Sequence, residues 1–131
     1  MLCGVDEAGR GPLAGSVFAA AVILDPSRPI LGLKDSKKLS PKQLSSVYLD
    51  IMKCALEVSF ATATPQELDQ INILQATFLA MKNAVDDLSI YPDYVIIDGN
   101  KGPSFEYPSR FLVKGDSKSM SIAAASIIAK V

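Results

Sequence analysis

Continuous apolar runs and stretches of helical spacing alternate along this chain. The runs at 2–6, 15–24 and 94–97 predict buried strands, since a strand covered on both faces is apolar nearly throughout. Residues 58–63 and 111–113 predict two more strands. Strands first, followed by alternating helices and strands, indicate an α/β fold with a mixed β-sheet and helices on its faces.

Three segments have the spacing of helices. Ser40, Pro41 and Gln43 form the pattern of a capping box and predict a helix start. Residues 64–67 (TPQE) repeat that arrangement before a second helical region, and 117–131 predict a third helix. The expected apolar faces comprise Leu44, Val47, Tyr48, Ile51 and Ala55; then Leu74, Phe78, Met81, Val85 and Leu88; and finally Ala124, Ile127, Ile128 and Val131.

The length of 131 residues predicts one domain, over 1–131, with no repeat or linker to divide it. The apolar stripe of the last helix reaches Val131 without a stop signal, so we expect a domain truncated at its C-terminal end. A hydrophobic content of 49% and a charged content of 21% are those of a soluble globular protein. No membrane span, secretory signal or disulfide framework is recognisable, which favours a cytoplasmic protein.

The chain contains no histidine, and this limits its chemistry. Ser-His-Asp and Cys-His catalysis and HExxH zinc sites are excluded. Cys3 and Cys54 are expected to be small core residues, because neither has an evident activating base. The net charge of −1 gives no overall basic field, so a polyanionic partner would need a local basic patch.

Acidic residues follow three of the predicted strands. Asp6 and Glu7 follow the first strand, Asp98 follows YVII, and Asp116 lies just past FLV. Functional groups gather where the strands of an open α/β sheet end, and converging carboxylates need a cation to neutralise them. Oxygen ligands of this kind suit Mg²⁺ or Mn²⁺, and two such ions can support phosphodiester hydrolysis. The alternative is that these acids merely start turns, as we expect of Asp25.

Basic and glycine residues near these acids are candidate phosphate ligands. Gly9, Arg10 and Gly11 follow the acidic pair; glycines allow close approach to a ligand, and arginine can fork onto phosphate. An ordinary tight turn is the alternative. Residues 4–11 also faintly match a P-loop, but they lack its lysine and hydroxyl. Lysines at 34–38, and others on either side of Asp116, suit backbone phosphates. The alternative is a solvated charged loop, which is the first choice for 34–38 taken alone.

Four motifs in order resemble bacterial ribonuclease HII. They are GVDEAGRGPLAG, DSKKLS, YVIIDGN and VKGDSKSMSIAAASIIAKV, and an NIL stretch begins at Asn72. The resemblance runs from Leu2 to Val131. It implies a ribonuclease H-like fold in which four carboxylates bind Mn²⁺ or Mg²⁺ and serve catalysis, with Asp6, Glu7, Asp98 and Asp116 at the matching positions.

The resemblance also implies a substrate. Such enzymes hydrolyse the RNA strand of RNA–DNA hybrids and single ribonucleotides embedded in duplex DNA, leaving 3′-hydroxyl and 5′-phosphate ends. Their glycine–arginine–glycine loop senses the ribose 2′-hydroxyl, the group that distinguishes RNA from DNA. The expected substrate-binding residues are Gly9, Arg10, Gly11, Lys37, Lys38, Asn72, Lys114 and Ser117.

Two function hypotheses remain open at this point. Members of that family continue beyond AKV with a tyrosine that stacks at the RNA–DNA junction, so this chain is expected to bind metal but to cleave weakly. The first hypothesis is a monomeric ribonuclease HII that acts by two-metal catalysis. The alternative is a truncated, catalytically idle nucleic-acid-binding fragment, and metal-dependent cleavage of a duplex with one ribonucleotide separates the two.

Overall fold

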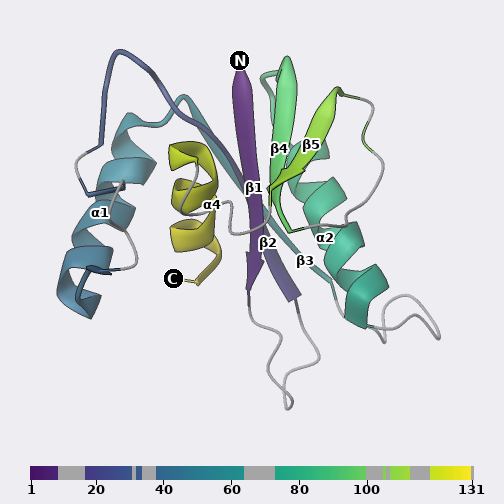
Figure 1. Cartoon of the computed structure of the whole chain (residues 1–131), viewed down its shortest axis with the longest axis horizontal. Coiled ribbons are helices and arrows are strands. Elements are labelled where there is room, and N and C mark those ends of the chain that lie inside the picture. Colours follow the sequence, from purple (N-terminus) through teal and green to yellow (C-terminus); the bar gives the residue numbers. More distant parts are fainter. Residues whose placement is uncertain are drawn as a thin grey trace.

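The elements of the chain follow the predicted α/β order (Figure 1). A computed structural model describes residues 1–8, 17–30, 32–33, 38–63, 73–99, 105, 107–112 and 119–130. In chain order the elements are β1 (Leu2–Ala8), β2 (Val17–Ile23), α1 (Pro41–Cys54), β3 (Glu57–Ala63), α2 (Ile73–Asp86), β4 (Tyr94–Asp98), β5 (Ser109–Leu112) and α4 (Met120–Lys130).

The five strands form one mixed sheet in the order β3-β2-β1-β4-β5. β1 lies at the centre, antiparallel to β2 and parallel to β4, while β3 is antiparallel to β2 and β5 is parallel to β4. Figure 1 shows α1 and α4 on one side of the sheet and α2 on the other. The mixed sheet with helices on both faces confirms the predicted architecture.

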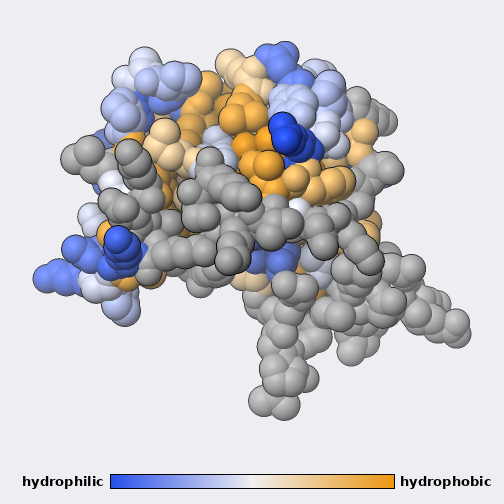
Figure 2. Space-filling view, viewed as in Figure 1, coloured by the Kyte–Doolittle hydropathy of each residue, from blue (hydrophilic) through white to orange (hydrophobic). Residues whose placement is uncertain are grey.

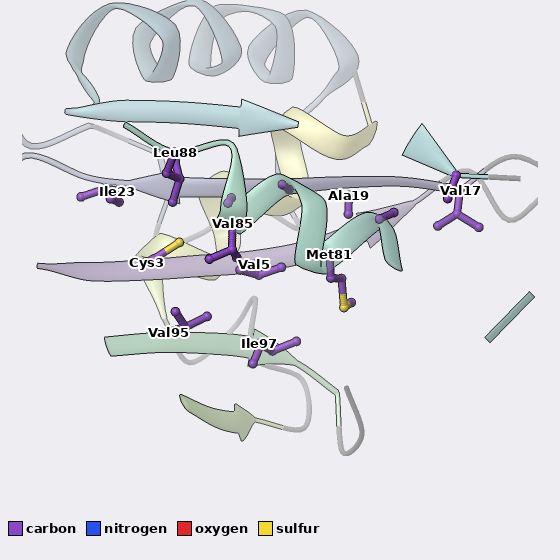
Figure 3. Close-up of a cluster of buried hydrophobic side chains, with 14 of the residues drawn as sticks. Cys3, Val5, Val17, Ala19, Ile23, Met81, Val85, Leu88, Val95 and Ile97 are labelled. Carbon is purple, nitrogen blue, oxygen red and sulfur yellow. The ribbon is translucent and has the colours of Figure 1, made fainter. Parts of the chain in front are cut away.

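The alternation of side chains along β1 divides the interior into two cores. Cys3 and Val5 belong to the core under α2, which Figure 3 shows between that helix and the sheet. Gly4 and Asp6 lie on the other face, where their cross-strand partners Val22 and Ala20 pack with α1 and α4. Asp6 is therefore the β1 acid that faces α4.

Helix α1 begins as the sequence predicts. The Ser40 side chain accepts a hydrogen bond from the Gln43 backbone N–H at 3.2 Å, and the Ser40 N–H donates to Gln43 Oε1 at 2.8 Å. Together these bonds complete the capping box, with Pro41 in the first turn. Val47 and Ile51 are buried in the core that α1 shares with α4 and β2, and Ala55 is the C-cap rather than a helical residue.

The buried face of α2 differs in part from the prediction. Met81 and Val85 are buried as expected, and Leu88 is buried just after the helix, but Phe78 is only partly buried. Alanines bring the helix close to the strands because they have no bulk beyond Cβ. The buried alanines are Ala76, Ala80 and Ala84. The predicted helix start at 64–67 lies outside the described residues, as does the side chain of Leu74.

The last strand and the last helix also differ from the prediction. β5 begins earlier than residue 111 and is an edge strand, so Ser109, Arg110 and Phe111 are exposed rather than buried. Helix α4 is buried on nearly all sides from Ser121 to Ile128, not along one stripe, because it lies on the centre of the sheet. Residues 117, 118 and 131 of that predicted helix lie outside the described part.

No helix in the described part of the chain has the length and apolar character to cross a bilayer; α1 and α2, with 14 residues each, are the longest.

Candidate functional site

Two of the predicted acids lie side by side at the end of the central strands. β1 and β4 are parallel, and Val5 pairs with Ile97, so the register brings Asp6 and Asp98 next to each other. Val95 and Ile97 face the α2 core, which places Asp98 on the opposite face, the same face as Asp6. Asp6 lies within β1, so it does not start a turn, and Asp98 is the last residue of β4.

The carboxylate of Asp6 is held in a crowded, buried position. Its side chain is 3% exposed, and Oδ1 accepts a hydrogen bond from the Glu7 backbone N–H at 2.8 Å. The hydroxyl of Ser126 on α4 also acts on it as a hydrogen-bond donor, with a smaller effect on its pKa than the Glu7 N–H. Burial raises the pKa of Asp6 to about 7, and the nearby charges of Asp98 and Glu7 act in the same direction against these two donors. Near neutral pH this carboxyl is poised to hold either a proton or a cation.

Glu7 is the third described acid at this end of the sheet. It is half-buried and pairs across the sheet with Ala19, which belongs to the core under α2. Alternation therefore turns Glu7 toward the face opposite Asp6, although its charge still contributes to the raised pKa of Asp6. The site thus gathers negative charge at both faces of one strand end.

Helix α4 approaches β1 closely enough to bring Ser126 to the site. A Cβ atom at Gly4 would overlap the carbonyl group of Ser121 and come within 2.6 Å of the Ile122 nitrogen. Glycine at this position therefore allows the α4 backbone to rest directly on the strand. Sequence reasoning missed both Gly4 and Ser126. The available signal was the small residues of 121–126 (SIAAAS), all but Ile122, which permit such an approach.

Lys38 is exposed and lies at the same end of the molecule as the acids. Because β3 is parallel to β1, Glu57 lies at the end where β1 begins, and α1 ends just before it. The 14 residues of α1 span about 21 Å, so its start lies at the opposite end (Figure 1). Lys38 precedes that start by three residues. The other predicted site residues lie outside the described residues: Gly9, Arg10, Gly11, Lys37, Asn72, Lys114, Asp116 and Ser117.

The chemistry of the described donors suits a hard cation. Among the described residues, no three His, Cys, Asp or Glu side chains form a group that could hold a metal ion. Asp6 and Asp98 supply carboxylate oxygens on one face, which Mg²⁺ and Mn²⁺ prefer. A cation there would offset the like charges that raise the pKa of Asp6. The donor set therefore fits a divalent ion, with further ligands required from elsewhere.

Cys3 does not offer a nucleophile. It is fully buried beneath α2, and burial raises the pKa of its thiol to about 12. A thiol of this kind stays protonated at neutral pH and is unreactive. This confirms the prediction that Cys3 is a core residue.

A pocket of about 610 Å³ lies at the other end of the sheet from the acids. Its lining is largely apolar and includes Leu2, Leu24, Leu33 and Met120. Figure 2 shows hydrophobic residues gathered on this side, near the start of β1. None of the described residues that line it belongs to the predicted site, so it is separate from the acidic cluster.

The comparisons with known proteins agree with this geometry. A family model described as Ribonuclease HII matches residues 3–131. The ribonuclease H2 of Pyrococcus horikoshii OT3 is 27% identical with a TM-score of 0.82, and the match covers 98% of this chain and 70% of that one. The RNase HII in a PCNA:RNase HII complex from Archaeoglobus fulgidus is 28% identical with a TM-score of 0.80, covering 99% and 70%.

A more distant neighbour shares the fold. Bst-RNase HIII, whose structure is a complex with Mn²⁺, is 24% identical with a TM-score of 0.76, and the match covers 98% of this chain and 50% of that one. These neighbours confirm the predicted ribonuclease H-like fold.

Proposed function

This chain belongs to the ribonuclease HII family, a family of nucleases, and on that premise we propose that it hydrolyses the RNA strand of RNA–DNA hybrids and single ribonucleotides embedded in duplex DNA. The products would carry 3′-hydroxyl and 5′-phosphate ends. One observation carries the proposal: Asp6 and Asp98 lie together on parallel strands, where burial keeps the pKa of Asp6 near 7. Acids that are held together at such a cost are typical of functional sites.

In this proposal Asp6, Glu7, Asp98 and Asp116 hold Mn²⁺ or Mg²⁺. The three described members supply only oxygen donors, which supports a hard divalent ion. When bound, two such ions supply an activated water and offset the charge that develops on the leaving 3′ oxygen. The Mn²⁺ complex of Bst-RNase HIII, a protein of the same fold, agrees with this choice of ion.

The substrate would approach from the end of the sheet where β1 ends. Lys38 is exposed just before the start of α1 at that end and is suited to a backbone phosphate. A loop at Gly9, Arg10 and Gly11 would contact the ribose 2′-hydroxyl. The remaining substrate-binding residues in the proposal are Lys37, Asn72, Lys114 and Ser117. A monomeric state and a cytoplasmic location remain predictions.

The alternative of a catalytically idle nucleic-acid-binding fragment is less well supported. A surface that only binds a polyanion gains nothing from Asp6, Glu7 and Asp98, because their negative charges repel phosphates. The cost of burying Asp6 has a ready explanation only if a cation joins it.

Cleavage of a labelled DNA duplex with one ribonucleotide tests the proposal. We expect cleavage beside the ribonucleotide in Mn²⁺ or Mg²⁺, none in EDTA, and none of an all-DNA duplex of the same sequence. Binding of the duplex without cleavage, at any concentration of either metal, would favour the idle fragment. Products with 5′-hydroxyl ends would contradict the proposed chemistry.

A further inference from the structure

We infer that Ser126 is a positioning residue of the proposed metal site: its hydroxyl, presented by α4, fixes the carboxylate of Asp6 for a cation. The inference rests on the proposed function and adds to it a residue outside the four acids. It arises from a contact between α4 and β1 rather than from any sequence motif of acids or lysines.

Helix α4 contacts strand β1 at two points. The α4 backbone at Ser121 lies against Gly4, and the Ser126 hydroxyl reaches Asp6. From Gly4 to Asp6 the strand advances about 7 Å, while five helical residues advance about 7.5 Å. The helix therefore runs along β1 in the same direction and at a matching rate. Since the first contact is between backbones, the position of Ser126 over Asp6 is set by the fold.

The environment of Ser126 makes its hydroxyl distinctive. The residue is 6% exposed and follows Ala123, Ala124 and Ala125, all buried, so an alanine would meet the packing requirement equally well. A serine within a helix often bonds to the backbone carbonyl four residues earlier, but this hydroxyl donates to a carboxylate on another element. A structural explanation from packing alone does not account for the hydroxyl.

The hydrogen bonds to Asp6 leave room for a cation. A carboxylate offers about four acceptor positions. The Glu7 N–H and the Ser126 hydroxyl each occupy one, from the strand and from the helix, and together they restrict rotation of the group. The remaining positions are thereby oriented before a cation arrives. Groups that orient a ligand in this way typically contribute 10- to 100-fold, as an order of magnitude, to metal affinity.

Ser121 provides a matched control. It lies on the same helix and is 7% exposed, about as buried as Ser126. It lies beside Gly4, however, and lines the apolar pocket at the far end of the sheet. Loss of its hydroxyl changes α4 equally without touching Asp6.

The test measures Mn²⁺ affinity by electron paramagnetic resonance of the free ion. Wild type, Ser126→Ala and Ser121→Ala are compared, with melting temperatures as a check on folding. We expect Ser126→Ala to weaken Mn²⁺ binding about tenfold or more and Ser121→Ala to leave it unchanged. In the metal-free protein, the carbon-13 carboxyl resonance of Asp6 should shift in Ser126→Ala, whereas that of Glu57 should not.

A second pair of variants guards against a folding defect. Ser126→Thr keeps the hydroxyl, and Ser126→Val has the shape of the threonine variant without the hydroxyl. The Ser126→Thr variant should therefore bind Mn²⁺ about tenfold more tightly than the Ser126→Val variant. Two results would overturn the positioning role while leaving the metal site in place. One is an equal Mn²⁺ affinity of the Ser126→Thr and Ser126→Val variants, and the other is an equal loss of Mn²⁺ affinity in Ser126→Ala and Ser121→Ala. If the wild type itself binds no Mn²⁺, the proposed function fails, and this inference fails with it.

Discussion

Each end of the sheet holds a carboxylate at a strand end, and the surroundings of these two carboxylates shift their pKa values in opposite directions. At the start of β3, Glu57 accepts hydrogen bonds from the Ser89 N–H at 2.6 Å, the Ser89 hydroxyl at 2.9 Å and the Ile90 N–H at 2.9 Å. At the end of β1, Asp6 is buried beside Asp98 and Glu7. Partial burial alone would raise the pKa of Glu57, but these donors lower it, whereas burial raises the pKa of Asp6 to about 7.

The difference is the one expected between a structural acid and an acid that the proposed function assigns to a metal site. Glu57 fixes the segment between α2 and β4 to the start of β3, and its charge favours folding. Burial and the charges of Asp98 and Glu7 outweigh the two donors to Asp6, so its charge opposes folding of the metal-free chain. A fold retains such a group when it serves a ligand, and in the proposed function that ligand is a cation.

The largest expected effect comes from Asp98→Asn. This substitution keeps the shape of the side chain but removes a charge that binds the proposed metal. A metal of this kind lowers the activation free energy of the reaction by several kcal/mol. We expect cleavage of a single-ribonucleotide duplex to fall about a thousandfold or more, with an unchanged circular dichroism spectrum. Glu57→Gln removes an acid at the other end and should leave the rate unchanged. A near-normal rate for Asp98→Asn would exclude Asp98 as a ligand.

Gly4→Ala should break the contact that supports the acidic end. The added methyl group overlaps the Ser121 carbonyl, and α4 has to move away from β1. Overpacking of this kind costs about 2–3 kcal/mol of unfolding free energy, measurable by urea denaturation. The same movement should withdraw Ser126 from Asp6 and weaken Mn²⁺ binding. A variant as stable as the wild type would show that α4 does not rest on the strand.

The pH dependence of stability distinguishes the two ends. The raised pKa of Asp6 means that the unfolded chain releases a proton between about pH 4 and 7 while the folded chain keeps it. The contribution of Asp6 is therefore fully present at low pH and is lost as the pH rises through 7. In EDTA, Asp6→Asn should be on the order of 3–4 kcal/mol more stable than wild type at pH 8, and this advantage should shrink toward zero at pH 4. An equal difference in stability between Asp6→Asn and wild type at the two pH values would argue against a raised pKa.

Glu57→Gln should produce the smallest effect, with the opposite dependence on pH. Its amide group would place a donor where Ser89 or Ile90 already donates, at a cost of about 1 kcal/mol in this partly exposed position. Because the pKa of Glu57 is lowered, its stabilisation is present above its ordinary value of 4.5 and is lost as the pH falls. Thermal melts at pH 3 and 7 should therefore show a difference only at pH 7.

Much of the fold could be predicted because it depends on local patterns. The capping box at Ser40 and the apolar strands of β1 and β4 determine their elements from a few neighbouring residues. The face of α2 could not be predicted as easily, since Ala76, Ala80 and Ala84 are buried for their small size rather than their hydrophobicity. The edge position of β5 depends on strand order, which no local pattern contains.

The candidate site could be predicted in its acids but not in its supporting contacts. Asp25 and Asp6 both accompany apolar strands, and the structure places them in different surroundings. Asp25 accepts bonds from the Ser27 N–H and hydroxyl and forms a turn, as predicted, whereas Asp6 is buried against α4. Ser126 lies 120 positions beyond Asp6 in the numbering of the chain, so their contact follows from tertiary packing alone.

The most direct measurement is anomalous diffraction from crystals soaked in Mn²⁺. The central claim is that the acidic end of the sheet, and not the apolar pocket at the other end, is built to hold a divalent cation. We expect a manganese peak between the carboxylates of Asp6 and Asp98, within the 2.0–2.6 Å range that is typical of hard cations and oxygen ligands, as an order-of-magnitude guide. Manganese bound elsewhere on the protein, with both carboxylates left without an ion, would contradict the account.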